Sequence, residues 1–274
     1  MVRPQDFPRR QAPPKKANPY LDLNTDYGQT ADRSFFEGKE RTLLHYVSSV
    51  NIPCCVHDGD PAQVLRDIET AKKNNCIVGA HIAYPDPKHD GYEPMDLSDE
   101  ELSAWIVLQL GAFSALCRAN DIDFEHVRPH GALYTQFLQN EAVAITVAKA
   151  IKRFDPWMML IAPFGPVTQK VQETVGIQIA EEVYLGKRVS ADGVLLLDRF
   201  HENLHPQGVI EQVKQLVMES AMTTEDGKVV KVSCKTMHLS PKLQGNMMIA
   251  ERISAMLGEV TPLPMLAAGN SGWA

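Results

Sequence analysis

The chain has 274 residues, of which 44% are hydrophobic and 22% are charged. This is ordinary globular composition, and it argues against a disordered, collagen-like or disulfide-stapled protein. The net charge is -7, and because residues 1–19 carry +4, the rest of the chain carries -11. An acidic body disfavours binding to nucleic acid or to an anionic membrane surface.

The two ends of the chain differ from its middle. Residues 1–19 are basic and rich in proline but hold no apolar stretch, so we expect a disordered tail rather than a secretory signal. Residues 20–260 are interpreted as one domain and residues 261–274 as a C-terminal tail. No run approaches the ~20 uninterrupted apolar residues of a membrane span. The five cysteines match no zinc pattern, so we expect reduced thiols and a cytoplasmic protein.

Apolar strand-like runs alternate with helical patterns along the chain. Strands are predicted over residues 20–24, 47–53, 76–80, 124–127, 158–162, 177–181 and 232–238. Helices are predicted to begin at Pro61, capped by Asp60, and at a capping box formed by Ser98 and Glu101. Further helices are predicted over 141–154 and 167–174, after Pro206 and over 247–257, with a hairpin over 221–231.

This alternation predicts an α/β fold with a parallel sheet, and a barrel is favoured over an open doubly wound sheet. Neither a G-x-G-x-x-G nor a G-x-x-x-x-G-K-[ST] pattern is present. A nucleotide-binding dehydrogenase and a P-loop nucleotidase are therefore both disfavoured.

Polar side chains follow one strand after another. The first strand carries Asp22, Asn24 and Asp26, and His57, His81, His130 and His238 follow later strands. In a parallel barrel, the carboxyl ends of the strands open on one rim, where barrel enzymes place their chemistry. Each histidine alone is readily explained as a structural residue, but their coincidence at one rim predicts a cleft with acid-base or metal chemistry.

The same residues lie in motifs that resemble those of a known family. The motifs are Asp22-Leu23-Asn24-x-Asp26-x-Gly28, Asn51-Ile52-x-Cys54-x-x-His57-x-Gly59-Asp60-Pro61, Gly79-Ala80-His81, Arg128-Pro129-His130-Gly131-Ala132-Leu133-Tyr134 and Ala180-Glu181-Glu182-Val183. In this order they resemble the LamB/YcsF family, the A subunit of prokaryotic 5-oxoprolinase. The resemblance covers about residues 20–257.

The resemblance implies a distorted seven-stranded β/α barrel of the type found in glycoside hydrolases and carbohydrate deacetylases. It also implies ATP-dependent opening of the lactam ring of 5-oxoproline to glutamate. Two partner subunits, B and C, would use ATP and Mg²⁺ to activate the lactam, and this chain would hydrolyse the activated intermediate.

Hydrolysis of an unstrained amide needs a base for water, a proton for the departing nitrogen and donors for the oxyanion. We expect Asp22, Glu182 or a neutral histidine to act as the base; Glu182 is preferred to Glu181 because it matches the family motif. The acid or the oxyanion donors are expected among His57, His81 and His130. The expected substrate-binding residues are Asn24, Asn51, Arg128, Tyr134, Lys187 and His238. In the alternative mechanism, Asp22, His57 and His81 hold a divalent metal ion.

Some positions depart from the family pattern. Gln29 stands where the family usually has Glu, Lys187 replaces an Arg, and Leu239 follows His238 where Gly is usual. Gln cannot act as a base, and Lys lacks the bidentate geometry of Arg. These changes favour a diverged substrate or a non-catalytic barrel that binds a lactam or a partner protein.

Overall fold

The computed structural model describes residues 21–37, 42–197 and 203–257. The tails expected at residues 1–19 and 261–274 lie outside these ranges. Seven strands form a closed barrel in the order β1-β2-β3-β4-β5-β6-β9, and each neighbouring pair is parallel. The strands are β1 (Asp22–Asp26), β2 (Ser49–Pro53), β3 (Ile77–Ile82), β4 (His126–Pro129), β5 (Met159–Pro163), β6 (Gln178–Tyr184) and β9 (Thr236–His238). The predicted seven-stranded barrel is confirmed.

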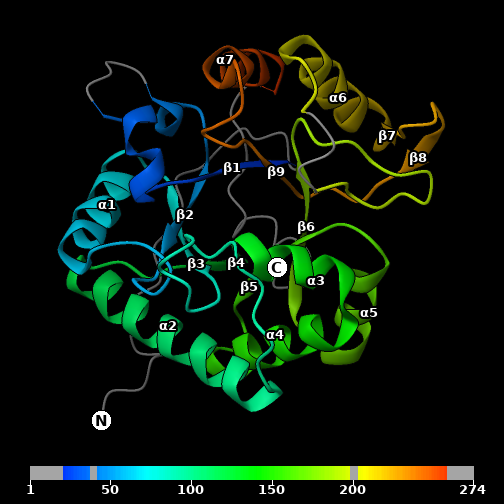
Figure 1. Ribbon diagram of the computed structural model, residues 1–274. Coiled ribbons are helices and arrows are strands. Elements are labelled where there is room, and N and C mark those ends of the chain that lie inside the picture. The colour runs from blue at the N-terminus through cyan, green and yellow to red at the C-terminus, as the bar shows by residue number, and fades with distance from the viewer. Residues whose placement is uncertain (1–20, 38–41, 198–202, 258–274) are drawn as a thin grey trace, which may run out of the picture.

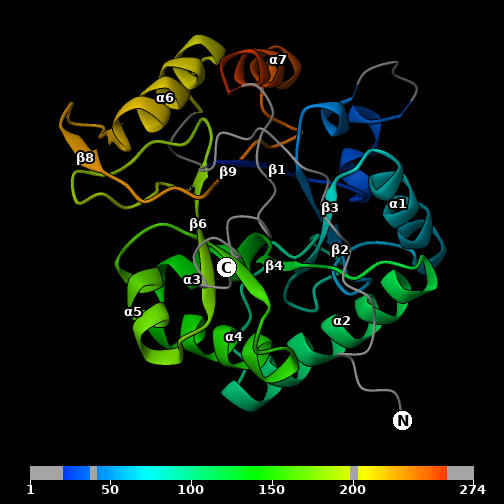
Figure 2. The same cartoon turned by 180° about the vertical axis from the view of Figure 1, so that it is seen from behind.

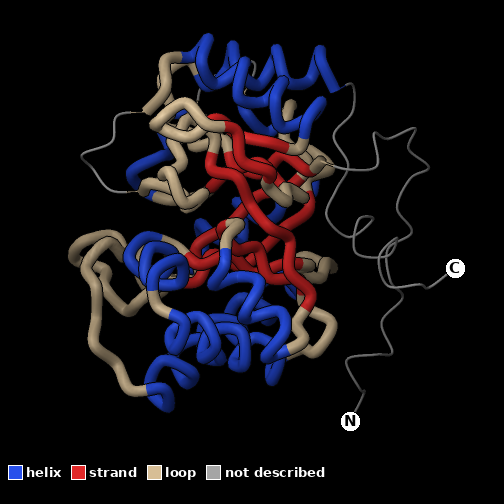
Figure 3. The backbone as a smooth tube through the Cα atoms, turned by 90° about the vertical axis from the view of Figure 1, so that its right-hand side faces the viewer, coloured by secondary structure: helices blue, strands red, loops and turns tan. Residues whose placement is uncertain are grey.

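Helices surround the strands on the outside (Figures 1 and 2). They are α1 (Pro61–Lys73), α2 (Asp99–Ala119), α3 (Gly131–Gln139), α4 (Glu141–Phe154), α5 (Pro166–Val175), α6 (Pro206–Glu219) and α7 (Asn246–Leu257). Figures 1 and 3 show the strands between the α6–α7 pair on one side and α2, α3, α4 and α5 on the other. Two short 3-10 helices, η2 (Thr30–Phe35) and η3 (Leu43–His45), lie between β1 and β2.

The helix starts follow from their capping residues. Asp60 accepts a hydrogen bond from the Gln63 amide at 3.0 Å, and Ser98 forms a reciprocal capping box with Glu101. Both predicted caps are confirmed, as is the hairpin, which is formed by β7 (Ala221–Thr223) and β8 (Val229–Lys231). Helix α3 was not predicted, because it has only nine residues and follows β4 after a single residue.

Helix α2 is the one described helix that is long and apolar enough to cross a membrane, with a mean hydropathy of 1.4. A third of that stretch is buried, and the helix packs against α1, α4 and β3. These contacts are those of a helix in the outer ring of a barrel.

The first strand begins two residues later than predicted. It runs from Asp22 to Asp26 rather than over residues 20–24, so Asp22 lies at its amino end and Asp26 at its carboxyl end. The mouth of the barrel, where the carboxyl ends of the strands open, therefore receives Asp26. Asp22 lies four residues away, or roughly 13 Å along a strand.

The barrel interior is mostly polar, apart from a small apolar cluster of Met159, Ile161 and Ala180, whereas barrels are commonly filled by branched apolar side chains. Asp22, Asn24 and Asp26 lie on one face of β1 and are all buried. Gly79 makes room for the ring of His126 inside the barrel, since a Cβ at this position would lie 1.9 Å from His126 Nε2. The apolar core instead lies between the strands and the helices, where Leu23 and Val127 are fully buried.

Candidate active site

Three hydroxyl groups surround Asp22 at the bottom of the barrel. Thr236 and Ser48 each donate a hydrogen bond to this carboxylate at 2.5 Å, and Ser49 donates at 3.0 Å. Burial raises the pKa of Asp22 to about 6, even though the hydroxyl donors lower it. The prediction that Asp22 joins the histidines at the rim is wrong, because the true start of β1 places Asp22 at the opposite end.

Glu182 occupies the middle of the barrel and already has its hydrogen-bond partners. Arg128 donates to both carboxylate oxygens, through Nε at 2.9 Å and Nη2 at 2.8 Å. Tyr134 donates to Oε2 at 2.7 Å and Asn24 to Oε1 at 3.0 Å. Burial alone would raise the pKa of Glu182, but the charge of Arg128, together with His238 and the hydrogen bonds from Arg128 and Tyr134, lowers it. This carboxylate anchors Arg128, and its geometry does not suit the role of a general base.

Two asparagines connect this middle layer to the layer above. Asn51 donates to Asn24 Oδ1 at 2.9 Å and to Asp26 Oδ1 at 3.1 Å. His238 Nδ1 lies 2.7 Å from the same oxygen of Asn24, and His126 Nε2 lies 3.0 Å from Asn51 Oδ1. Asn24 and Asn51 are thus fully engaged in positioning Asp26 and His238.

Asp26, His81 and His130 meet at the mouth. His81 Nδ1 lies 3.4 Å from Asp26 Oδ1, and His81 Nε2 lies 2.8 Å from His130 Nδ1. One ligand atom of each residue lies within 4.8 Å of the others. Burial lowers the pKa of both imidazoles well below the usual range, and the charge of Arg128 lowers that of His81 further. Both rings are therefore neutral at pH 7.

His57 completes what we call the mouth cluster: Asp26, His57, His81 and His130. Its ring stacks on that of His130, with centroids 4.5 Å apart and an angle of 19° between the planes. His57 is 1% exposed, and neither ring nitrogen has a hydrogen-bond partner among the described residues. Burial lowers its pKa to about 4, so this imidazole is also neutral at pH 7.

The loop that follows β3 covers the mouth cluster. His130 Nε2 lies 2.8 Å from the Asp90 carbonyl oxygen, and the Ala132 amide donates to the Gly91 carbonyl at 2.9 Å. The backbones approach so closely that a Cβ on Gly131 would lie 2.3 Å from the Gly91 oxygen. Tyr92 adds an edge-on contact to His130, with ring centroids 4.9 Å apart.

The structure brings most of the predicted site residues together. The rings of His57, His81 and His130 lie within 6.0 Å of one another. His238 and Arg128 approach Asp26 at 3.5 and 3.4 Å, and Asn24, Asn51, Tyr134 and Glu182 lie directly below. The sequence prediction assigned no role to Asp26, Gln29 or His126. The period-two spacing of Asp22, Asn24 and Asp26 was the signal that Asp26 shares their face.

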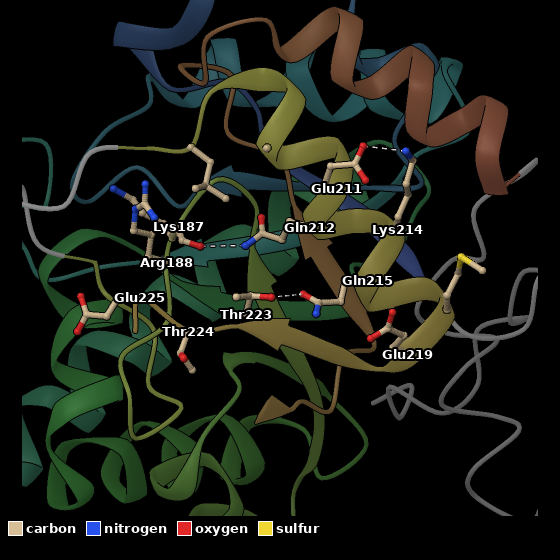
Figure 4. Close-up of a pocket in the computed structure, with 13 residues that line it drawn as sticks. Lys187, Arg188, Glu211, Gln212, Lys214, Gln215, Glu219, Thr223, Thr224 and Glu225 are labelled. Carbon is tan, nitrogen blue, oxygen red and sulfur yellow. Dashed lines mark hydrogen bonds and ion pairs between the residues drawn. The ribbon is translucent and has the colours of Figure 1, made fainter. Parts of the chain in front are cut away.

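Lys187 is not part of this arrangement. After β6, Gly186 takes a φ of +86° and turns the chain outward, so Lys187 lines a surface groove of about 550 Å³ beside α6 (Figure 4). Gln212 donates to the Lys187 carbonyl at 2.9 Å, and Glu211, Lys214 and Glu225 also line the groove. This groove lies outside the barrel and shares no lining residue with the mouth cluster.

Comparisons with known proteins agree with this barrel. The model of the LamB/YcsF family matches residues 21–262. The chain belongs to the LamB/YcsF family. The A subunit of 5-oxoprolinase from Histophilus somni is 33% identical over 87% of this chain and 95% of its own length. That of Staphylococcus epidermidis is 32% identical over 79% of this chain and 86% of its own length.

A solved structure of similar fold extends the comparison. The lactam utilization protein of Thermus thermophilus superposes with a TM-score of 0.80 and 28% identity, over 89% of this chain and 99% of its own. The curated relatives carry a name that marks them as one subunit of a larger enzyme.

Proposed function

We propose that this chain is an amide hydrolase subunit that opens the lactam ring of 5-oxoproline, or of a related cyclic amide, to the free amino acid. The observation that carries the proposal is the mouth cluster, in which three neutral imidazoles and one carboxylate converge at the barrel mouth. The names of the relatives, which refer to 5-oxoprolinase and to lactam utilization, support the substrate class.

The chemistry follows from the protonation states of the cluster. A neutral imidazole can accept a proton from water as it attacks the carbonyl carbon, and can then return the proton to the departing nitrogen. His57 suits this role because both of its nitrogens have no partner among the described residues. Asp26 is ionised, because burial raises its pKa but the interactions with His238, Arg128, His130 and Asn51 together lower it by more. It therefore stabilises an imidazolium that forms beside it.

The activation step belongs to other chains in this proposal. An unstrained lactam is a poor electrophile, and the sequence holds no phosphate-binding loop. We propose that B and C subunits use ATP and Mg²⁺ to phosphorylate the lactam, and that this chain hydrolyses the activated product to the amino acid and inorganic phosphate in the cytoplasm. The described cysteines are all free, in keeping with that compartment.

The test is to co-express the chain with candidate B and C subunits from its own genome and to measure ATP-dependent glutamate release from 5-oxoproline. Release is expected to need this chain and to be lost in His130→Ala. His45→Gln is the matched control, because His45 is exposed in η3 near the opposite end of the barrel and Gln preserves its capping box.

A non-catalytic lactam-binding role is the second candidate. It is favoured by Gln29, whose Nε2 lies 3.2 Å from His130 Nδ1, at the position where a carboxylate is usual. Calorimetry with 5-oxoproline separates the two candidates: lactam binding without glutamate release in the complete assembly would replace the hydrolase by the binding protein.

A further inference from the structure

The protons of the mouth cluster can be assigned from its hydrogen bonds. The Asp90 carbonyl can only accept, so His130 Nε2 must carry a hydrogen and donate it across the 2.8 Å separation. In a neutral ring, His130 Nδ1 then carries a lone pair that points at His81 Nε2, 2.8 Å away. This assignment leaves two tautomers of His81 to consider.

Neither neutral tautomer of His81 satisfies both of its neighbours. If Nε2 carries the hydrogen, it donates to His130, but the lone pair of Nδ1 then faces the Asp26 carboxylate at 3.4 Å. If Nδ1 carries the hydrogen, it faces Asp26, but two imidazole lone pairs then face each other at 2.8 Å. Two buried acceptors that face each other repel, and a cation bound between them would remove this repulsion.

The balance of buried charges leads to the same result. Glu182 and Asp26 are both buried carboxyl groups, and Arg128 is the cation that contacts both of them. Arg128 makes its two short bonds to Glu182 and reaches Asp26 at only 3.4 Å. A second buried carboxylate normally needs a cation of its own.

We propose that Asp26, His81 and His130 bind a single divalent transition-metal ion of the zinc class at the barrel mouth, with His57 beside the open coordination positions. Two imidazoles and one carboxylate are ligands that suit such ions, and open positions remain for water or substrate. The hydrogen bond from His130 Nε2 to Asp90 is the outer contact that commonly orients a metal-binding histidine. This set replaces the one expected from the sequence, with Asp26 in place of Asp22 and His130 in place of His57.

The geometry requires only a small adjustment. Ligand nitrogens around a tetrahedral zinc ion lie about 3.3 Å apart, given Zn–N bonds of about 2.0 Å. His81 Nε2 and His130 Nδ1, now 2.8 Å apart, would need to separate by about half an ångström. A bound ion would polarise a carbonyl or lower the pKa of its water, and His57 would lie beside that water.

The test measures the metal directly and does not depend on the proposed activity. Tag-free protein is stripped with a chelator, dialysed and titrated with Zn²⁺ or Co²⁺ in a calorimeter. A single ion per chain is expected. Asp26→Asn, His81→Gln and His130→Gln are each expected to weaken binding by about 100-fold or more. His45→Gln and Cys55→Ser are the controls that should bind as the wild type does, since His45 lies near the far end of the barrel and Cys55 is the half-buried thiol nearest in sequence to His57.

A second measurement covers variants that do not fold. The Co²⁺ form of the wild-type chain is studied by X-ray absorption, where two imidazole ligands and no sulfur are expected. The proposal is overturned if the wild type binds neither ion, if sulfur ligands are found, or if folded variants of Asp26, His81 and His130 bind as tightly as the wild type. Loss of glutamate release with intact metal binding would instead count against the proposed function alone.

Discussion

The guanidinium of Arg128 makes a two-point contact with the carboxylate of Glu182 inside the barrel, with Nε–Oε1 at 2.9 Å and Nη2–Oε2 at 2.8 Å. This pair joins β4 to β6, two strands that are not neighbours in the sheet. The ring of Tyr134 lies 4.6 Å from the guanidinium carbon and closes the pair on one side.

Glu182→Gln is expected to destabilise the protein by about 3–5 kcal/mol, because Arg128 would lose its buried partner. Urea unfolding followed by circular dichroism measures this loss. The double variant Glu182→Gln with Arg128→Met should recover part of the loss, since it removes the unpaired charge. A double variant that is less stable than the single one would contradict this account of the pair.

Asp22 is expected to make stability depend on pH. Its pKa of about 6 in the folded protein lies above the value of 3.8 for a free carboxyl group, so the folded state holds the proton more tightly. The contribution of Asp22 is therefore fully present below about pH 4 and is lost as the pH rises through 6, by about 3 kcal/mol in total. Unfolding of the wild type and of Asp22→Asn is compared between pH 4 and pH 7.5. The difference in free energy of unfolding between the two proteins should shift in favour of Asp22→Asn as the pH rises, and a constant difference would refute the assignment.

His57→Phe should separate stability from function. Phe keeps the ring that stacks on His130 but removes two buried nitrogens that have no partner among the described residues. Removal of an unsatisfied buried polar group is expected to stabilise the protein by about 1–3 kcal/mol. A higher melting temperature together with loss of glutamate release is the expected result. A lower melting temperature would mean that the nitrogens of His57 contribute to the fold.

Gln29→Glu tests the clearest departure from the family pattern. The amide nitrogen of Gln29 lies 3.2 Å from His130 Nδ1, so a carboxylate at this position would add a negative charge beside the proposed metal site. Zn²⁺ affinity is expected to rise by roughly 10-fold, as for an added oxygen ligand or a close anion. Calorimetry on Gln29→Glu and on Gln29→Met, which removes both polar atoms, provides the comparison. Weaker binding in Gln29→Glu than in Gln29→Met would contradict the placement of the ion.

The sequence predicted the barrel and the convergence of His57, His81 and His130, because strand periodicity and rim position are local properties of a repeating fold. The predicted position of Asp22 at the rim was wrong. Strand β1 begins two residues later than predicted, which places Asp22 at its amino end. The sequence prediction also assigned Glu182 a catalytic role, whereas four hydrogen-bond donors already occupy its carboxylate oxygens. These hydrogen bonds join residues that are far apart in the chain. Asn24 and Glu182, for example, are separated by 158 residues, so no local sequence pattern predicts their contact.

The contact between His130 and the Asp90 carbonyl has a consequence for access to the site. The members of the mouth cluster are at most 8% exposed, and movement of the loop carrying Asp90 and Gly91 away from His130 would widen the access of a ligand to them. That movement breaks the one bond that holds the hydrogen on His130 Nε2. Entry of a ligand is therefore coupled to the choice of which His130 nitrogen carries the hydrogen. With the loop closed, the hydrogen is held on Nε2, whereas with the loop open either nitrogen of His130 could carry it.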